Sequence, residues 1–318
     1  MQTRPLGCSD LKISPLGIGT WAIGGPEGDW NWGPQNDADS IAAIRRALDL
    51  GLNWIDTAPA YGKGHSEEVV GKAIQGVSPR PYVFTKNSLV WGRDGNITNC
   101  LKAGSIRKEC EDSLRRLKVE ALDLWQVHWP NPDADVEEGW AEMARLQKAG
   151  KVRWIGVSNF SISQMKRAQT IAPVASLQPP YSALRRDIEA EILPFCGREN
   201  IGVIVYSPMQ AGLLSGRMTR ERVKNLPPGD WRHRSEHFRE PLLSRSLALQ
   251  EALGIVAGRH GFAAGVAALA WVLRRSEVTG AIVGVRNARQ AEELAPALEF
   301  RLSPDEMREI GNFPTENP

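Results

Sequence analysis

Residues 51–75 read GLNWIDTAPAYGKGHSEEVVGKAIQ. The stretch begins with a short apolar run, Asn53–Asp56, which predicts a β-strand that ends on a carboxylate. A glycine-flanked loop follows, and apolar residues at helical spacing then predict a helix over Ser66–Gln75. A strand joined to a helix in this way is the unit from which parallel sheets are built.

The same order of strand and helix recurs along the 318 residues of the chain. We predict eight strands, at Leu16–Gly19, Asn53–Asp56, Tyr82–Lys86, Leu122–His128, Val152–Ser158, Val174–Gln178, Val203–Ser207 and Ala281–Gly284. We predict helices at Ala38–Leu50, Ser66–Gln75, Ser105–Leu117, Val136–Ala149, Ser161–Thr170, Asp187–Arg198, Leu242–Gly258, Ala263–Arg275 and Ser303–Ile310. Apolar strands connected through helices are typical of a buried parallel sheet.

Eight such strands close most simply into a (β/α)₈ TIM barrel. A doubly wound sheet is the alternative, and periodicity alone leaves it open. No predicted strand is followed by a GxGxxG turn, and the glycines between residues 17 and 25 do not open a helix as a Rossmann site requires. We therefore expect a barrel that forms one domain over residues 1–318, because α/β barrels often reach this length.

Two segments depart from the alternation. Arg4–Pro15 predicts a β-hairpin, with Gly7 near its turn, that caps the closed end of the barrel. Met209–Pro241 forms an extended loop after strand seven, and loops of this length are usually functional. At the other end of the chain, Ser303 is the expected N-cap of the last helix.

The composition excludes several classes of partner. The chain is 42% hydrophobic and 24% charged, as is ordinary for a globular protein, and its net charge is only +2. Without a basic run, we expect no nucleic-acid partner. Residues 1–19 lack the apolar region of a signal peptide, and no stretch approaches the roughly 18 apolar residues of a membrane helix. The four cysteines are dispersed without ligand spacing, so we expect no metal and a cytoplasmic location.

Ionisable side chains end three neighbouring predicted strands. Asp56, Lys86 and His128 stand at these ends, and Tyr61 follows in the loop after Asp56. Each alone is typical of an ordinary feature: a turn, a solvated lysine, a core histidine or a surface aromatic residue. Because the active site of such a barrel lies at the carboxyl ends of its strands, the four together predict a catalytic group.

The chemistry of this group is that of a general acid. A tyrosine hydroxyl has a pKa of about 10, and an adjacent ammonium group lowers it. A carboxylate behind the lysine keeps that lysine charged, and a neutral imidazole can orient a carbonyl oxygen. Tyr61 could then protonate a carbonyl oxygen while hydride reaches the carbonyl carbon.

The residues around these positions resemble the aldo-keto reductase superfamily, and most closely its bacterial sugar and general-stress branch. The similar motifs run in the family's order from about Arg4 to Ile310, and they are Gly19–Trp21, Gly51–Gly71, the strand that ends at Lys86, Asp123–Pro130, Lys151–Phe160, Gln178–Tyr181 and Tyr206–Met209. The resemblance implies NADPH-dependent reduction of aldehyde, ketone or sugar-derived carbonyls. It also implies Tyr61 as acid and base, Lys86 and Asp56 as its tuning pair, and His128 as the group that orients the substrate.

The resemblance further implies a set of residues that contact NADP(H). Ser158, Asn159 and Gln178 would hold the carboxamide, Tyr206 would stack on the nicotinamide, and Arg286 would meet the 2′-phosphate. Residues 207–216 would wrap the pyrophosphate beside Arg217. The full implied set is Thr20, Trp21, Asp56, Ser158, Asn159, Gln178, Tyr206, Ser207, Pro208, Met209, Gly212, Gly216, Arg217, Gly284, Arg286, Gln290 and Glu293.

Three positions depart from the family pattern. Leu294 stands where the family often has Asn beside the adenine. The motif Ile282–Arg286 lacks the Lys-Ser pair of some members, so the choice of NADPH over NADH rests on Arg286. Trp54 replaces a phenylalanine or smaller apolar residue, and we expect this to affect only packing.

Several of the 11 tryptophans fall where a substrate would enter. Trp21 and Trp129 match family positions near the substrate carbonyl, and we expect Trp30, Trp32 and Trp91 to complete an aromatic substrate wall. Trp125, Trp154 and Trp271 are interpreted as core residues. The charged segment Arg217–Arg239 is either a solvated loop or a flap over the cofactor phosphates, and the two interpretations carry equal weight.

Other functions are weighed on the same residues. Potassium-channel β-subunits resemble this family as regulatory subunits, but their pattern has Asn at the position of His128, which favours an enzyme here. A Schiff-base lyase is disfavoured because a lysine paired with Asp56 is a poor nucleophile. Double-bond reductases of the family carry Glu at the His128 position. We therefore expect a small-molecule carbonyl substrate, no membrane partner, and a monomer or weak homo-oligomer.

Overall fold

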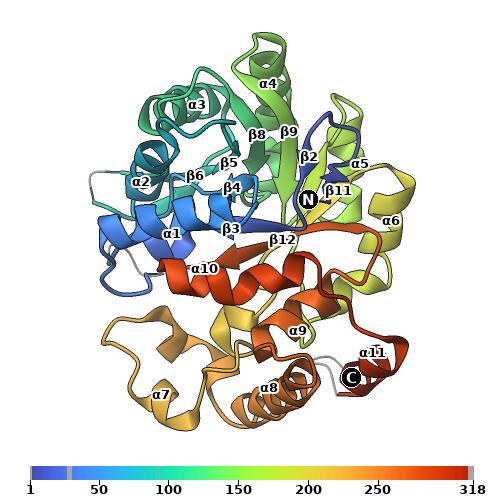
Figure 1. The fold of residues 1–318 in the computed structure, drawn as a ribbon. Coiled ribbons are helices and arrows are strands. Elements are labelled where there is room, and N and C mark those ends of the chain that lie inside the picture. The colour runs from blue at the N-terminus through green and yellow to red at the C-terminus, as the bar shows by residue number, and fades with distance from the viewer. Residues whose placement is uncertain (1, 27–30, 93, 314–318) are drawn as a thin grey trace.

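A closed barrel of eight parallel strands forms the centre of the computed structural model, which describes residues 2–26, 31–92 and 94–313 (Figure 1). The strands, in chain order, are β3 (Leu16–Gly19), β4 (Trp54–Asp56), β5 (Tyr82–Asn87), β8 (Leu122–Val127), β9 (Val152–Ser158), β10 (Ser176–Gln178), β11 (Gly202–Val205) and β12 (Val278–Gly284). The barrel closes where β12 pairs with β3. The predicted (β/α)₈ fold is confirmed, and the doubly wound alternative is excluded.

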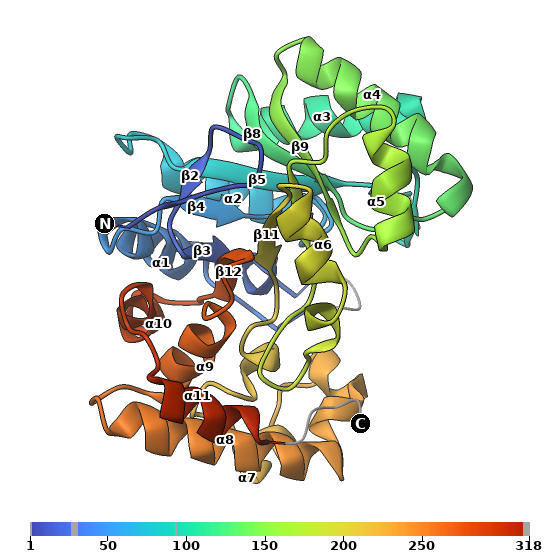
Figure 2. The same ribbon diagram turned by 90° about the vertical axis from the view of Figure 1, so that its right-hand side faces the viewer.

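Helices surround the barrel. They are α1 (Asp37–Asp49), α2 (His65–Ile74), α3 (Ala103–Leu117), α4 (Val136–Lys148), α5 (Ile162–Gln169), α6 (Ile192–Arg198), α7 (Arg220–Lys224), α8 (Leu242–Gly258), α9 (Ala264–Val272), α10 (Ala288–Leu294) and α11 (Pro304–Gly311). In the two views, α8 and α11 lie on the side of the molecule away from α3 and α4 (Figures 1 and 2). Ser303 caps α11 through a capping box, as predicted.

Some elements differ from their predicted form. The helix predicted over Asp187–Arg198 is a 3₁₀ turn, Asp187–Glu189, followed by α6. Pro194 explains the break, because a proline fits the first turn of a new helix and not the interior of a long one. The helices α7 and α10 and the hairpin of β6 (Leu89–Trp91) and β7 (Ile97–Asn99) were not predicted. They are too short for their apolar spacing to be recognised.

A hairpin plugs the amino end of the barrel, as predicted. Its strands are β1 (Arg4–Pro5) and β2 (Lys12–Ile13). Apolar side chains of the hairpin pack inside the barrel against one layer of strand residues, and this buried cluster includes Leu6, Leu11, Ile13, Trp54, Phe84, Leu124, Ile204 and Ile282. A Cβ at Gly17 would lie 2.1 Å from the indole of Trp54, so the glycine makes room for this large ring. Trp54 therefore acts in packing, as its position suggested.

A polar layer lies one side-chain repeat further along the same strands. Because side chains alternate between the two faces of a strand, Asp56, Lys86 and Gln126 point inward two residues after Trp54, Phe84 and Leu124. Lys86 stands beside Gln126 in the register of β5 and β8, and Gln178 stands beside Ser158 in that of β10 and β9. The fold thus gathers polar groups at the carboxyl ends of the strands.

The long connection after β11 folds into a compact segment. It contains α7 and three short 3₁₀ turns at Gln210–Gly212, Trp231–Arg234 and Glu236–Phe238. Together with Leu243 of α8, it buries an apolar cluster that includes Leu213, Met218, Leu226 and Phe238. This packing disagrees with the interpretation as a solvated loop. In the part of the chain that the structure describes, no helix is long and apolar enough to span a bilayer.

Candidate active site

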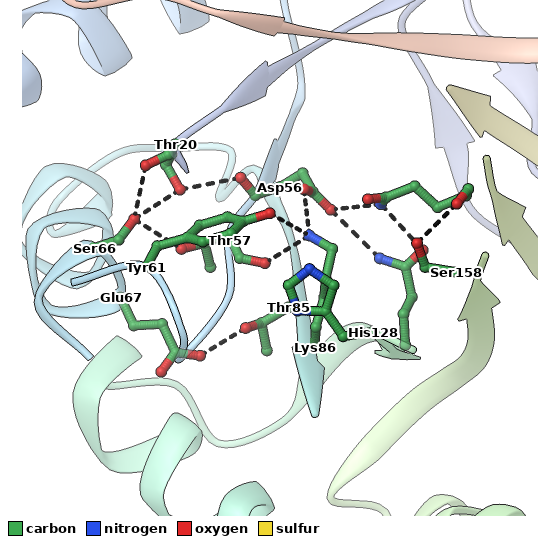
Figure 3. A network of polar contacts seen from close by, with 12 residues as sticks. Thr20, Asp56, Thr57, Tyr61, Ser66, Glu67, Thr85, Lys86, His128 and Ser158 are labelled. Carbon is green, nitrogen blue, oxygen red and sulfur yellow. Dashed lines mark hydrogen bonds and ion pairs between the residues drawn. The ribbon is translucent and has the colours of Figure 1, made fainter. Parts of the chain in front are cut away.

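Lys86 lies at the centre of the candidate site. Its Nζ atom donates hydrogen bonds to Oδ1 of Asp56 at 2.5 Å, to the backbone oxygen of Thr57 at 3.0 Å and to the hydroxyl of Tyr61 at 3.4 Å (Figure 3). These contacts use all three N–H groups of an ammonium. The side chains of Lys86 and Asp56 are buried. The structure therefore brings three of the four predicted catalytic residues together around one nitrogen atom.

Lys86 stays charged although its side chain is buried. Burial acts to lower the pKa of Lys86, but the Asp56 carboxylate and the Tyr61 hydroxyl outweigh it and hold the pKa above its ordinary value. Lys86 is therefore an ammonium at neutral pH, and its partner Asp56 is the compensating charge.

Tyr61 is held by a close approach of two loops. A Cβ at Gly62, which has φ +62°, would lie 1.8 Å from the backbone oxygen of Gly24, so only glycine permits this contact. The hydroxyl of Tyr61 points toward Lys86 (Figure 3). The expectation of a lowered Tyr61 pKa is wrong for this structure. Burial raises the pKa more than the nearby ammonium lowers it, so the phenol is protonated at neutral pH, as a general acid must be.

His128 lies beside Tyr61. The two rings meet edge to face, with centroids 5.9 Å apart. Burial and then the charge of Lys86 hold the pKa of His128 well below its ordinary value, so its imidazole is neutral at neutral pH. Among the described residues, Nδ1 of His128 has no hydrogen-bond partner. The ring can therefore orient a ligand oxygen without adding charge to the site.

Two amide side chains hold the other oxygen of Asp56. Gln178 donates from Nε2 to Oδ2 of Asp56 at 2.9 Å, and Gln126 donates to the same oxygen at 3.4 Å. Gln126 was missed in the sequence, although its spacing from His128 in a strand places both residues on the same face. Its place between the apolar residues Trp125 and Val127 was the available signal.

The residues expected at the nicotinamide are bonded to one another. Asn159 donates from Nδ2 to Oγ of Ser158 and to the backbone oxygen of His128, both at 3.0 Å, and its Oδ1 accepts from the Tyr206 hydroxyl at 2.9 Å. The Ser158 hydroxyl donates to the backbone oxygen of Gln178 at 2.8 Å. Acceptor positions remain on Ser158, Asn159 and Gln178. These acceptors fit the N–H₂ group of a carboxamide.

The residues expected at the pyrophosphate and adenine lie on two segments, the one after β11 and the one from the end of β12 into α10. Arg217, from the segment after β11, forms an ion pair with Glu293 of α10, and Arg289 also contacts that carboxylate. Gly216 has φ +84° and donates its N–H to Gln250. The turns between β11 and Arg217 are formed by Ser207, Pro208, Met209 and Gly212, of which Ser207 has φ +54° and Gly212 has φ +94°. Gly284 is exposed at the end of β12. Leu294, where the family often has Asn, packs against the core.

Arg286 contacts the loop that follows β3. Its guanidinium donates to Oε1 of Gln35 at 2.7 Å and to the backbone oxygen of Pro34 at 2.5 Å. Gln35 donates in return to the backbone oxygen of Arg286 at 2.8 Å, and Gln290 accepts from its backbone N–H. With a third contact to the backbone oxygen of Trp32 at 3.4 Å, two of the five N–H groups remain for a 2′-phosphate, which would compete with these partners for the others.

Tryptophans form a wall beside Tyr61. Trp231, in the segment after β11, stacks on Trp21 with ring centroids 5.1 Å apart, and Trp32 meets both rings edge to face. Trp21 lies 6.4 Å from the Tyr61 ring. Trp231 was missed because nothing local in its charged segment marks it. The structure thus brings Trp21 and Trp32 together.

The remaining expected residues make no ring contact with this group among the described residues. Trp129 is 41% exposed, directly after His128, and Trp91 is half-buried on β6. Trp30 lies outside the described residues. Thr20 is buried behind Asp56, where its hydroxyl donates to the Asp56 backbone oxygen at 3.1 Å. Within residues 2–26, 31–92 and 94–313, no cluster of three His, Cys, Asp or Glu side chains could hold a metal ion.

Comparison of the sequence with family models identifies the family. The model of the aldo/keto reductase family matches residues 15–313. The chain belongs to the aldo/keto reductase family. It is 37% identical to the aldo-keto reductase YhdN of Bacillus subtilis over 316 residues, which are 98% of this chain and 93% of that protein. It is 34% identical to an NADH-specific methylglyoxal reductase of Escherichia coli over 317 residues, 95% of each chain.

Solved structures of family members agree with this family assignment. A glycerol dehydrogenase from Gluconobacter oxydans superposes with a TM-score of 0.88 at 36% identity, covering 98% of this chain and 94% of that one. An aldo-keto reductase from Klebsiella pneumoniae in complex with NADPH superposes with a TM-score of 0.75 at 27% identity, covering 100% and 97%. The resemblance seen in the motifs is confirmed.

Proposed function

We propose that the protein is an NADPH-dependent oxidoreductase that reduces aldehyde and ketone carbonyls, sugar-derived ones among them, to alcohols. The observation that carries the proposal is the arrangement at Lys86, whose Nζ atom joins the Asp56 carboxylate to the Tyr61 hydroxyl. The names of two relatives support small oxygen-rich substrates, because one is a methylglyoxal reductase and the other a glycerol dehydrogenase.

Tyr61 would act as the general acid. A nicotinamide cofactor, when bound, supplies the hydride. As charge develops on the carbonyl oxygen, the Tyr61 hydroxyl transfers its proton to that oxygen, and the electron pair stays on the phenolate. The Lys86 ammonium, 3.4 Å away, stabilises the phenolate, and Asp56 keeps Lys86 charged. The neutral His128 imidazole orients the carbonyl oxygen beside Tyr61. In alcohol oxidation the same proton returns to Tyr61.

The neutral polar groups of Ser158, Asn159 and Gln178 would hold the carboxamide, and the ring of Tyr206 would pack on the nicotinamide. Arg286, as the planar cation at the end of β12, supports NADPH over NADH. Two relatives differ in the cofactor that they are named with, since one is called NADH-specific and the other was solved in complex with NADPH.

The test uses the purified protein and its Tyr61→Phe variant. Each is mixed with NADPH or NADH and a panel of aromatic aldehydes, small ketoaldehydes and sugars, and the loss of reduced-nicotinamide absorbance is recorded. We expect turnover with NADPH that falls by at least about 100-fold in Tyr61→Phe, because general acid catalysis typically contributes 10²–10⁴-fold. Binding of NADPH without turnover on any carbonyl would instead indicate a cofactor-binding regulatory subunit. Equal rates in the two proteins would contradict the role of Tyr61.

A further inference from the structure

We propose that Gln126 is a positioning residue that fixes the side-chain amide of Gln178, so that Gln178 presents only an acceptor to the nicotinamide carboxamide. The inference rests on the proposed function and names a residue that acts through Asp56 and Gln178. Gln126 lies in β8 beside Lys86 and is fully buried inside the barrel. A buried amide must be hydrogen-bonded within the protein, because leaving it unpaired destabilises the fold.

The contacts of Gln126 form a closed triangle with Asp56 and Gln178. Nε2 of Gln126 donates to Oδ2 of Asp56 at 3.4 Å. Nε2 of Gln178 donates to the same oxygen at 2.9 Å and to Oε1 of Gln126 at 3.3 Å. Each of the three groups therefore makes contacts with the other two. Oδ1 of Asp56 is bonded to Lys86, so the triangle leaves the catalytic ion pair intact.

This triangle determines which way the Gln178 amide faces. If the amide were reversed, its oxygen would face both the Asp56 carboxylate and Oε1 of Gln126, and both contacts would be repulsive. In the observed orientation both N–H groups of Gln178 are used. Only Oε1 of Gln178 remains for a ligand, and it is an acceptor.

An acceptor at this place selects for a ligand with N–H donors. The primary carboxamide of a nicotinamide ring has two, whereas the acetyl group of a 3-acetylpyridine analogue has none. Asp56 alone constrains Gln178 through one N–H group, and Gln126 constrains the other. Without Gln126, the Gln178 amide has an unpaired N–H group, and its orientation is held by one contact in place of two.

The experiment compares binding of NADPH and of reduced 3-acetylpyridine adenine dinucleotide phosphate. Dissociation constants are measured by quenching of tryptophan fluorescence in the wild type and in Gln126→Met, which keeps the length of the side chain without its amide. We expect the wild type to prefer NADPH by about 5- to 10-fold, as one hydrogen bond implies. In Gln126→Met we expect this preference to fall to about 2-fold, with little change for the analogue.

A matched control uses Ser176→Ala. Ser176 is also buried, lies on β10 two residues before Gln178, and its Oγ has no partner among the described residues. We expect Ser176→Ala to keep the wild-type preference. An equal loss of preference in both variants would show a general response of the barrel to substitution and would overturn the proposal.

A second variant covers the case that Gln126→Met does not fold. Gln126→Leu also lacks the oxygen that accepts from Nε2 of Gln178. We expect it to lose the preference for NADPH as Gln126→Met does. A full preference in folded Gln126→Met or folded Gln126→Leu overturns the inference and leaves the proposed function standing. If the wild type binds neither dinucleotide, the inference and the proposed function are both contradicted.

Discussion

The carboxylate of Glu109 accepts a hydrogen bond of 2.9 Å from the backbone N–H of Ser88. Ser88 follows β5, two residues after Lys86, and has φ +75°, a conformation that a serine rarely adopts. Its hydroxyl also bonds the backbone of Trp129, at 3.2 Å and 3.3 Å. Glu109 therefore stabilises a strained residue that ties the end of β5 to the segment carrying His128.

We predict that Glu109 makes the stability of the fold depend on pH. Burial raises the pKa of Glu109 from 4.5 to about 7, despite hydrogen bonds from Ser105 and Ser88. The folded state thus holds this proton more tightly than the unfolded state. The stabilisation of the folded state by the bound proton is fully present below about pH 4.5 and is lost as the pH rises through about 7. The free energy of unfolding should fall by roughly 2–4 kcal/mol over this range. Glu109→Gln removes this dependence.

Urea unfolding of the wild type and of Glu109→Gln across this pH range measures the effect. We expect the variant to gain stability relative to the wild type as the pH rises. Glu111→Gln is the control, because Glu111 lies on the same helix with its side chain 52% exposed, in an ion pair with Lys151 at the surface. Parallel pH profiles for the wild type and Glu109→Gln would contradict the prediction.

The Lys86–Asp56 pair should show strong coupling in folding stability. Asp56→Asn leaves a buried ammonium without its counter-charge, and Lys86→Met leaves a buried carboxylate, so each should cost about 3–5 kcal/mol. The double variant should cost less than the sum, because no unpaired charge remains. Chemical denaturation of the four proteins gives the coupling. Additive costs would mean that the two charges are compensated elsewhere.

We predict that the side chain of Gln35 lowers the preference of the protein for NADPH over NADH. Its Oε1 competes with a 2′-phosphate for the guanidinium of Arg286. We expect Gln35→Leu to raise the ratio of kcat/KM for NADPH to that for NADH by about 3- to 10-fold, and Arg286→Leu to lower it. Binding of 2′-AMP compared with 5′-AMP tests the same contact without turnover. Unchanged ratios in both Gln35→Leu and Arg286→Leu would show that the 2′-phosphate is bound elsewhere.

Removing Trp231 should weaken substrate binding more than turnover. Its ring stacks on Trp21, which in turn lies beside Tyr61. Because such aromatic pairs contribute about 0.5–1.5 kcal/mol, we expect Trp231→Leu to raise KM for the carbonyl substrate about 3- to 10-fold, with kcat at saturating cofactor nearly unchanged. Trp91→Leu, on the β6–β7 hairpin, is the comparison. A fall in kcat alone would place Trp231 in the chemical step.

Much of the candidate site follows from local sequence. Each strand is a short run whose side chains alternate between two faces, so the residue that ends it is visible in the sequence. Asp56, Lys86 and His128 were found in this way, and the structure gathers them with Tyr61 at one end of the barrel (Figure 3). The hairpin cap and the N-cap at Ser303 were also visible, because turns and helix caps depend on local residue types such as Gly7 and Pro304.

What the sequence by itself determined is thus the order of strands and helices and the chemical groups at the strand ends, because both depend on local periodicity. Only the tertiary structure decided which of these groups meet. Gln126 reaches Asp56 because of the register between strands, and Trp231 reaches Trp21 because the long segment after β11 packs against the loop that follows β3. The pKa of Tyr61 is likewise decided only by the folded barrel, because burial raises this pKa and the charge of Lys86 lowers it. The balance depends on how deeply the closed barrel encloses the hydroxyl.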